Sequence, residues 1–335
     1  MNKINITSPT ITITKVVGLT YHPIISIVIP LYNKASTIQH TISSVISQTI
    51  QNFELIIVDG NSTDGSFEIA SQINDPRIVL FKQHGKGIST ARNQGVEKAK
   101  SDIVAFLDAD DTWEPNFLET ILQLTEKYPN AGMYGTAFAV CRNNNPLRTV
   151  SLDTDKDGDL LSYFSDFTEA GHPIIITSAF AVRKSAFLVV GGYSETLRVG
   201  EDHDLFGKLA LQYPVSYSPK ICSRYNLASE NNTDTVDYVL GVPLEEYLTE
   251  HNHWETAEKK MGFSEFLDHW RIRTGGRNIY SGFRREGRVQ IRKVSTNKSF
   301  LLKYGFLLIS YLPIPYRILS ANFVRRVLRL LQISI

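Results

Sequence analysis

Short apolar runs alternate with longer segments of mixed polarity over the first third of the chain. The apolar runs occupy residues 24–30, 53–59, 77–83 and 102–108. Residues 24–30 form a short continuous apolar run that Pro30 stops, as expected for a strand buried on both faces, and the other three runs are expected to be strands as well. The segments between them, 34–49, 62–73 and 87–100, space their apolar residues as helices do. Strands alternating with helices form parallel βαβ units with right-handed crossovers. The pattern predicts an α/β fold with a mostly parallel central sheet.

The rhythm changes after about residue 129. Longer connections separate three expected strands at 131–140, 173–182 and 220–226, and 201–213 reads as a helix. From about residue 242 the chain looks helical, first polar and then basic. We therefore expect an N-terminal extension (1–24), an α/β domain (25–240) and a helical, basic C-terminal region (241–335).

Charge is distributed unevenly behind a net charge of +1. Residues 271–335 hold 14 Lys and Arg and a single acid, Glu286, whereas the rest of the chain is acidic. Such a split favours a basic tail that meets an anionic surface, although a solvated basic helix face would look the same.

The end of the chain indicates a membrane surface as that partner. Residues 301–312 are too few to span a bilayer, which takes about 20 residues. The next stretch combines an apolar face with Arg325, Arg326 and Arg329, which predicts an interfacial helix on anionic lipid. The apolar positions are Ile318, Leu319, Phe323, Val327, Leu328 and Leu331. A helix docked on the protein is the alternative, and nucleic acid is not expected, because the apolar content suits lipid better than a phosphate backbone.

Cysteine content and the N-terminus predict a cytoplasmic location. Cys141 and Cys222 are far apart and lack the spacing of a zinc site or a disulfide framework. The first residues are too polar for a signal peptide. We expect a peripheral protein on the cytoplasmic face of a membrane.

Carboxylates cluster in "AFLDADDTWEP", residues 105–115. Asp108 and Asp110 follow a buried strand, so both can reach the crevice where ligands bind in open α/β sheets. Mg²⁺ or Mn²⁺ is held by one or two protein carboxylates together with substrate phosphates. The alternative is an Asp-rich turn in which Asp110 and Asp111 cap a helix.

Two other acidic positions are candidates for the same crevice. Asp59 ends the second expected strand and could accept the imide N–H of a uracil ring, or simply stabilise its turn. Glu201, Asp202 and Asp204 crowd the start of an expected helix, where capping explains Glu201 and Asp204. Asp202, near other carboxylates, is expected to have a raised pKa and to act as a general base.

Six segments occur together in an order and spacing that resembles the family 2 glycosyltransferases of the GT-A fold. They are "SIVIPLYNKASTI", "ELIIVDGNSTDGS", "GKGISTARNQG", "IVAFLDADD", "GGYSETL" and "GEDHDL". The similarity covers roughly residues 25–215. It implies a Rossmann-like βαβ sandwich and an inverting, metal-dependent transfer from a nucleotide sugar, with a UDP-sugar as the expected donor, to a saccharide or lipid-linked acceptor.

The resemblance also implies roles for individual residues. Asp59 would bind the base, Pro30, Tyr32 and Asn33 would line the base and ribose pocket, and Arg92 and Asn93 would lie near the sugar diphosphate. Asp108 would contact the ribose or the metal, Asp110 would ligate Mn²⁺ or Mg²⁺, and Asp202 would deprotonate the acceptor, with Glu201 beside the substrate. Residues near Tyr134, Thr177 and Ser178 are expected in the pocket. Asn61 and His203 depart from the family pattern, which often has Gly and Trp there.

Other functions fit parts of the sequence. Gly85 and Gly87 come near a dinucleotide-binding fingerprint, but Thr90 replaces its third glycine. A sugar-phosphate nucleotidyltransferase and a non-catalytic, membrane-associated nucleotide-binding scaffold remain open alternatives.

Overall fold

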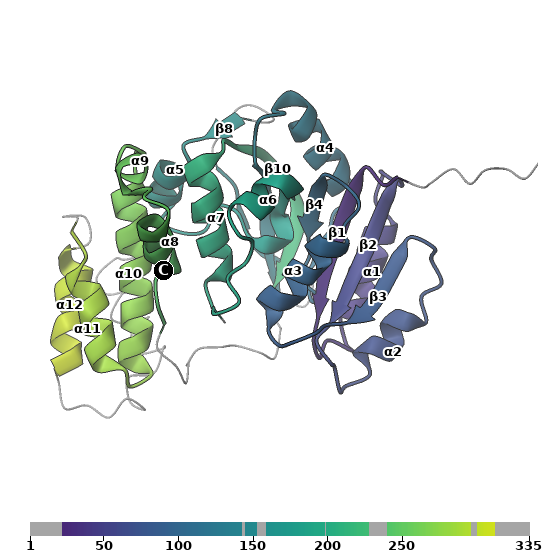
Figure 1. Ribbon diagram of the computed structural model, residues 1–335. Coiled ribbons are helices and arrows are strands. Elements are labelled where there is room, and N and C mark those ends of the chain that lie inside the picture. The colour runs from purple at the N-terminus through teal and green to yellow at the C-terminus, as the bar shows by residue number, and fades with distance from the viewer. Residues whose placement is uncertain are drawn as a thin grey trace, which may run out of the picture.

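The computed structural model describes residues 22–142, 145–152, 159–197, 199–227, 240–295 and 300–311. A strongly twisted sheet with helices on both faces forms the first part of the chain, and a group of helices packs at one side of it (Figure 1). The expected interfacial helix at 318–331 lies outside the described residues, as does the N-terminal extension before residue 22.

The first four expected strands are confirmed and run parallel. They are β1 (Ile25–Leu31), β2 (Phe53–Asp59), β3 (Ile78–Lys82) and β4 (Ile103–Phe106), in the order β3-β2-β1-β4. The helices that connect them are α1 (Ile38–Ile46), α2 (Ser66–Ser71) and α3 (Ile88–Lys98). Because all four strands run the same way, the loops that follow them gather at one edge of the sheet.

The sheet continues through strands of mixed direction. Its order beyond β4 is β9 (Phe180–Arg183), β6 (Met133–Arg142), β10 (Val215–Asn226) and β5 (Thr112–Trp113). β9 is antiparallel to both β4 and β6, and β10 is parallel to β6. Short β7 (Asn145–Val150) and β8 (Asp159–Leu161) pair with β6 and β10. The helices here are α4 (Phe117–Lys127), α5 (Tyr163–Ala170), α6 (Lys184–Val189) and α7 (Glu201–Gln212).

The expected strand at 173–182 is wrong over most of its length. Only Phe180 onward is a strand, and a 3-10 turn, η1 (Thr177–Ala179), precedes it. The side chains of this segment are apolar enough for a strand, but the turn brings Ser178 to the Asp-rich segment, where its hydroxyl donates to Asp111.

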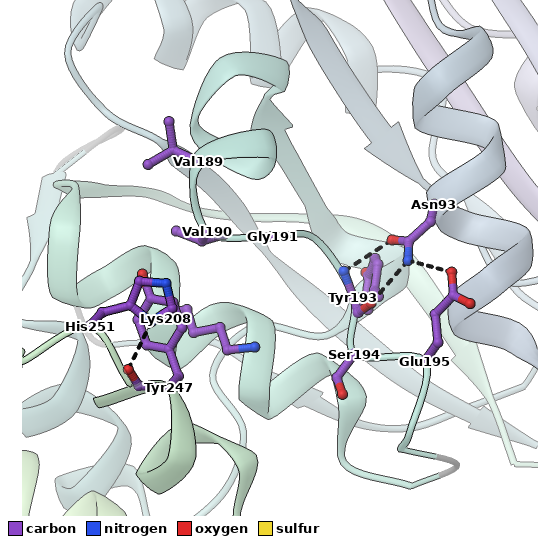
Figure 2. Close-up of a pocket in the computed structure, with 10 residues that line it drawn as sticks. All are labelled: Asn93, Val189, Val190, Gly191, Tyr193, Ser194, Glu195, Lys208, Tyr247 and His251. Atoms are coloured by element: carbon purple, nitrogen blue, oxygen red, sulfur yellow. Dashed lines mark hydrogen bonds between the residues drawn. The ribbon is translucent and has the colours of Figure 1, made fainter. Parts of the chain in front are cut away.

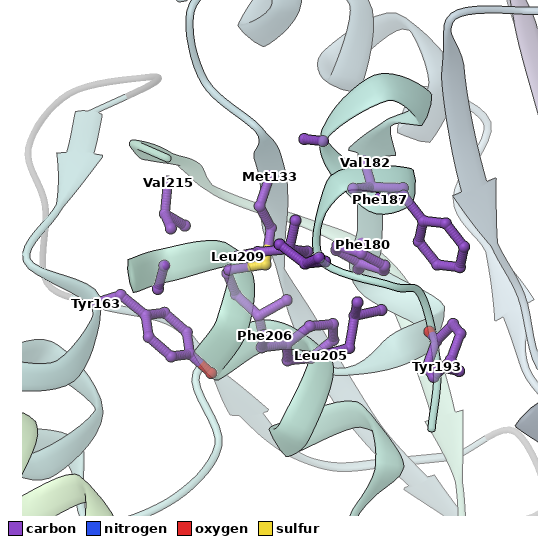
Figure 3. Close-up of a cluster of buried hydrophobic side chains, with 14 of the residues drawn as sticks. Met133, Tyr163, Phe180, Val182, Phe187, Tyr193, Leu205, Phe206, Leu209 and Val215 are labelled. Atoms are coloured by element: carbon purple, nitrogen blue, oxygen red, sulfur yellow. The ribbon is translucent and has the colours of Figure 1, made fainter. Parts of the chain in front are cut away.

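The pleat of the strands divides the core into two layers. Ile27 and Ile29 of β1 lie in the cluster that includes α1 and α4, whereas Val28 lies in the cluster on the opposite face. Both β1 and β2 are buried along their whole length, which explains why apolar residues dominate them. Figure 3 shows the second layer, where Phe180 of the sheet meets Phe206 and Leu209 of α7.

Five helices follow the α/β part. They are α8 (Pro243–Glu250), α9 (Trp254–Glu258), α10 (Phe263–Tyr280), α11 (Arg284–Arg292) and α12 (Phe300–Tyr311). Helix α10 is central: Phe266 packs edge-on against Phe164 and Phe167 of α5, while α11 and α12 form the outer edge (Figure 1). A Cβ added at Gly275 would come within 2.6 Å of Ile291, so this glycine permits the close approach of α11. No helix in the described ranges has the length and apolar character needed to cross a bilayer.

Candidate active site

Asp59 and Asp108 lie at the same edge of the sheet, as the strand pattern predicts. Asp59 ends β2 and Asp108 follows β4 by two residues, and β1 lies between these two parallel strands. This is the edge at which open α/β sheets bind ligands.

Arg92 of α3 connects Asp108 to the first turn of α7. Its Nη2 donates to Asp108 Oδ1 at 2.7 Å and its Nη1 donates to Glu201 Oε1 at 3.0 Å. The guanidinium also lies 5.0 Å from the ring centroid of Tyr193. Burial would lower the pKa of Arg92, but Asp108 and Glu201 outweigh it and raise that pKa, so the side chain stays charged. A buried cation therefore holds a carboxylate from a strand tip and one from α7 together.

Asp202 lies next to Glu201 and forms a pair with His203. Nδ1 of His203 is 2.8 Å from Asp202 Oδ1, and the backbone N–H of His203 donates to the same oxygen. The expectation of a raised pKa for Asp202 is wrong. Burial acts in that direction, but His203 and, more weakly, Arg92 stabilise the carboxylate and lower its pKa below the usual value. Asp202 is thus held ionised and able to accept a proton.

Burial has its expected effect on the neighbouring Glu201. The pKa of Glu201 is raised, first by burial, against the lowering effect of Arg92, and Asp202 raises it further. The capping expectation for Glu201 and Asp204 is wrong. Gly200 is the N-cap at φ +82°, a conformation that favours glycine, and the buried Asp204 pairs with Lys208 at 2.6 Å.

Asp110 faces a cation that the sequence did not single out. Lys34, in the loop after β1, places Nζ 2.7 Å from Asp110 Oδ2. Neither Asp110 nor Asp111 caps α4, because that helix begins at Phe117. The capping alternative for the Asp-rich segment is therefore not supported.

Asp111 has a structural part in the same segment. It is buried, accepts a hydrogen bond from Ser178 Oγ at 2.5 Å and another from the backbone N–H of Asn226 at 2.8 Å. Burial, together with Asp110 and Asp108, raises the pKa of Asp111. It ties η1 and β10 to the loop that carries Asp108 and Asp110.

The loops after β1 and β2 hold each other in place. Asn33 N–H donates to Ser62 Oγ, and its side-chain oxygen accepts from the Thr63 N–H. Asn33 and Asn61 both have positive φ, at +51° and +65°. The left-handed conformation explains why glycine suits position 61 and why Asn, which tolerates it, can replace glycine. Pro30 lies inside β1.

The carboxylate of Asp59 is used by its own turn. It accepts hydrogen bonds from the N–H groups of Asn61 and Ser62, and the residue is completely buried. This is the turn-stabilising arrangement that the sequence left open. The exposed Tyr32 ring lies beside Gly60 in the same region. A base could reach Asp59 only after neighbouring side chains move.

The side chain of Asn93 bonds to the loop between α6 and α7. Its amide donates to Tyr193 O and Glu195 Oε1, and its oxygen accepts from the Tyr193 N–H. Figure 2 shows Asn93 at one side of a hollow of about 460 Å³, with Lys208 and His251 at the other. Because both ends of its amide are engaged, Asn93 fixes the loop that carries Tyr193.

Tyr134 and Ser178, two residues expected near the pocket, have different surroundings. Tyr134 is the second residue of β6 and lies level with Ala105 of β4 across β9, and its hydroxyl donates to Ala131 O. Ser178 accepts the Asp108 N–H at 3.2 Å.

A second hollow, of about 270 Å³, contains the candidate base. Asp202 and Glu201 line it from α7, and Trp270, Arg273 and Arg277 line it from α10. None of the α10 residues was expected from the sequence, because nothing in a polar helix so far along the chain indicates which strand tip it faces. Lys34 was missed for a similar reason, since a lysine in a loop carries no sign of its partner.

Comparison with known proteins places the chain in a family. The sequence profile described as Glycosyl transferase family 2 matches residues 26–190. An uncharacterized glycosyltransferase of Haemophilus influenzae is 31% identical over 253 residues, which cover 71% of this chain and 80% of that protein. A UDP-Glc:alpha-D-GlcNAc-diphosphoundecaprenol beta-1,3-glucosyltransferase, WfgD of Escherichia coli, is 37% identical over 123 residues, 36% of this chain and 48% of its own length.

A solved structure extends the likeness to the fold. S. aureus TarS 1–349, crystallised in complex with UDP-GlcNAc, superposes with a TM-score of 0.58 at 17% identity and covers 86% of this chain and 89% of its own. The expected GT-A fold with a helical C-terminal part agrees with this neighbour. The family expected from the six sequence segments is confirmed, and the dinucleotide-binding, nucleotidyltransferase and scaffold alternatives give way to it. The chain belongs to glycosyl transferase family 2 and is a glycosyltransferase.

Proposed function

We propose that the protein moves a sugar from a UDP-sugar to a hydroxyl of a lipid-linked or polysaccharide acceptor, with inversion and with Asp202 as the general base. The observation that carries the proposal is the Arg92 bridge between Asp108 and Glu201. Asp108 is expected at the donor, and Asp202, the residue after Glu201, is expected at the acceptor. The bridge supports the proposal that both act in one site.

The reaction needs a single proton acceptor in this arrangement. The acceptor hydroxyl gives its proton to the Asp202 carboxylate as its oxygen bonds to the anomeric carbon. The bond from that carbon to the diphosphate breaks, and UDP leaves with the electron pair. His203 keeps Asp202 ionised before the transfer, because the pair lowers the pKa of the carboxylate. A direct displacement of this kind inverts the anomeric centre.

The donor set around Asp110 fits a divalent cation that binds together with a diphosphate. Asp108 Oδ2 and Asp110 Oδ1 have no hydrogen-bond partner among the residues that the structure describes. No cluster of three or more His, Cys, Asp or Glu side chains suited to a metal occurs in those residues. Two carboxylate oxygens are enough for Mg²⁺ or Mn²⁺ when substrate phosphates complete the shell. A bound cation would neutralise charge on the departing diphosphate.

The relatives support the choice of substrates. The name of WfgD gives UDP-glucose as donor and a diphosphoundecaprenol-linked sugar as acceptor, and TarS was crystallised with UDP-GlcNAc. For this chain we propose a UDP-sugar donor bound near Asp59 and Tyr32, without choosing the sugar.

We further propose that the protein works peripherally at the cytoplasmic face of a membrane. The support is the excess of Lys and Arg in residues 271–335, which would be attracted to anionic lipid. Truncation after Tyr304 should abolish flotation with anionic vesicles, and undiminished flotation would contradict the proposal.

The donor half of the proposal is tested by titrating UDP into the protein with and without Mn²⁺. We expect UDP affinity to rise with Mn²⁺ in the wild type and to lose this rise in Asp110→Ala. Asp102→Asn is the matched control, because Asp102 is exposed at the opposite end of β4. A metal effect that persists in Asp110→Ala contradicts the ligand role. Turnover with a panel of UDP-sugars then identifies the donor.

A further inference from the structure

The hollow between α7 and α10 has an acidic wall and a basic wall. Asp202 and Glu201 face it from the first turn of α7, and Arg273 and Arg277 face it from α10. Arg273 and Arg277 are four residues apart, so they lie on the same face of the helix. Trp270 lines the same hollow between the two walls.

Both carboxylates of the acidic wall have a partner within the protein. Glu201 pairs with Arg92 at 3.0 Å, and Asp202 pairs with His203 at 2.8 Å. Each of the two carboxylates therefore already has a partner that does not come from α10.

Arg273 differs from its neighbour Arg271 in this respect. Arg271 pairs with Glu245 at 2.6 Å and with Asp268 at 3.0 Å, so it holds α10 to α8. Arg273 is exposed and forms no ion pair or side-chain hydrogen bond within the described part of the chain. His269, one turn earlier, has a pKa lowered to about 4 by burial and by the charges of Arg273 and His203. Arg273 thus gives the basic wall a positive charge that its neighbours among the described residues leave unbalanced.

Tight packing fixes the basic wall in place. Gly276, in the same turn as Arg273, lies so close to α12 that an added Cβ would come within 2.8 Å of Phe306. Trp270 is buried and contacts the ring of His203 edge-on, with 6.1 Å between centroids. The distance between the two walls is therefore set by the core and does not depend on a loop.

We propose that this hollow binds a phosphate ester carried by the acceptor saccharide, with Arg273 and Arg277 at the phosphate and Asp202 at the reacting hydroxyl. The inference rests on the proposed function, because it takes Asp202 as the base. A guanidinium presents paired N–H donors that match phosphate oxygens, and such charge-assisted bonds are strong. The volume of about 270 Å³ is near the lower end for small-molecule sites, roughly 300–1,000 Å³, so it suits one sugar ring with its phosphate.

Binding of a sugar phosphate tests the proposal without requiring turnover. N-acetylglucosamine 1-phosphate is titrated into the full chain, saturated with UDP in EDTA, and N-acetylglucosamine is titrated in parallel. We expect the wild type to bind N-acetylglucosamine 1-phosphate more tightly than N-acetylglucosamine. Arg273→Gln should weaken binding of the phosphate by roughly tenfold or more. Arg273→Lys should restore part of it.

Arg285→Gln is the matched control. Arg285 is also an exposed arginine of a C-terminal helix, α11, but it does not line the hollow. The Arg285→Gln variant should bind the sugar phosphate as the wild type does. Equal binding by Arg273→Gln and the wild type overturns the proposal, and so does equal binding of the sugar with and without phosphate.

Two further measurements separate the sources of failure. Flotation with phosphatidylglycerol vesicles should be the same for Arg273→Gln and the wild type. If Arg273→Gln lost only its binding to vesicles, Arg273 would bind bilayer phosphate, and the proposed saccharide site would be overturned. UDP affinity, measured with Mn²⁺, should be unchanged in Arg273→Gln. Failure of the wild type to bind UDP would contradict the proposed function, whereas failure of the sugar phosphate alone contradicts only this inference.

Discussion

Lys34 Nζ lies 2.7 Å from Oδ2 of Asp110, the carboxylate proposed to bind the metal. Both side chains are mostly buried, with 17% of each exposed. The ammonium therefore competes with a divalent cation for the same carboxylate, or moves to the diphosphate when the cation binds.

Replacing Lys34 should strengthen the binding of Mn²⁺ in the absence of nucleotide. Lys34→Met removes a positive charge next to the site, and we expect an affinity increase of roughly five- to tenfold. Electron paramagnetic resonance of free Mn²⁺ measures it. Lys86→Met, at an exposed position of another loop, is the control and should bind Mn²⁺ as the wild type does. Unchanged or weaker Mn²⁺ binding by Lys34→Met would show that the ion pair does not oppose the metal.

Arg92 should matter for stability as well as for the site. Arg92→Met leaves Asp108 and the mostly buried Glu201 without their shared cation, so we expect a loss of about 3–5 kcal/mol in the free energy of unfolding. Urea denaturation measures the loss. Adding Glu201→Gln should recover part of it, because one of the two uncompensated charges is then removed. A loss below about 1 kcal/mol, as expected for the exposed Arg285→Met, would contradict a buried bridge.

His203 should set the acidic limb of the pH–rate profile. Asp202 accepts a proton only when ionised, and His203 lowers its pKa, so the wild type should keep its rate to low pH. In His203→Phe burial acts without that opposition, the pKa of Asp202 rises, and the acidic limb should move up by about one pH unit or more. His40→Phe, on the exposed face of α1, is the control. An acidic limb at the same pH in both variants would exclude the pair as the cause.

Much of the site could be predicted from the sequence, because parallel strands place their carboxyl ends at the same edge of the sheet. That rule put Asp59 and Asp108 at one edge from sequence alone, and the structure agrees. The rule does not predict which contacts a side chain makes with its neighbours in the sequence. The pKa of Asp202 was therefore expected in the wrong direction, because the ring of His203 turns onto its carboxylate.

Contacts between distant segments were the least predictable. Segment 173–179 is as apolar as a strand, but η1 is favoured because Ser178 satisfies the buried Asp111. Trp270 and Arg273 reach Asp202 only through the packing of α10 on α5, and helical spacing within α10 does not reveal that partner.

His269 should make the protein less stable in mild acid. Its pKa is lowered from 6.5 to about 4 in the folded state, so between these values the unfolded chain binds a proton that the folded chain does not. The free energy of unfolding therefore falls as the pH drops from about 6.5 to 4, by roughly 2–3 kcal/mol at pH 4.5. Urea denaturation of His269→Gln at pH 7 and pH 4.5 should show a smaller drop than the wild type. The exposed His40→Gln should keep the full drop, and an equal drop in His269→Gln would contradict a neutral, buried imidazole.

The central claim is that Asp202 removes the proton from the acceptor, and Asp202→Asn tests it most directly. The side chain keeps its size and can still meet His203, so the fold and the affinity for UDP and Mn²⁺ should be retained. Without a proton acceptor, turnover with the identified UDP-sugar should fall by about 10²–10⁴-fold. The decisive measurement is kcat of Asp202→Asn beside its UDP affinity. The account predicts lost turnover with unchanged UDP binding, and turnover within a few-fold of the wild type would contradict it.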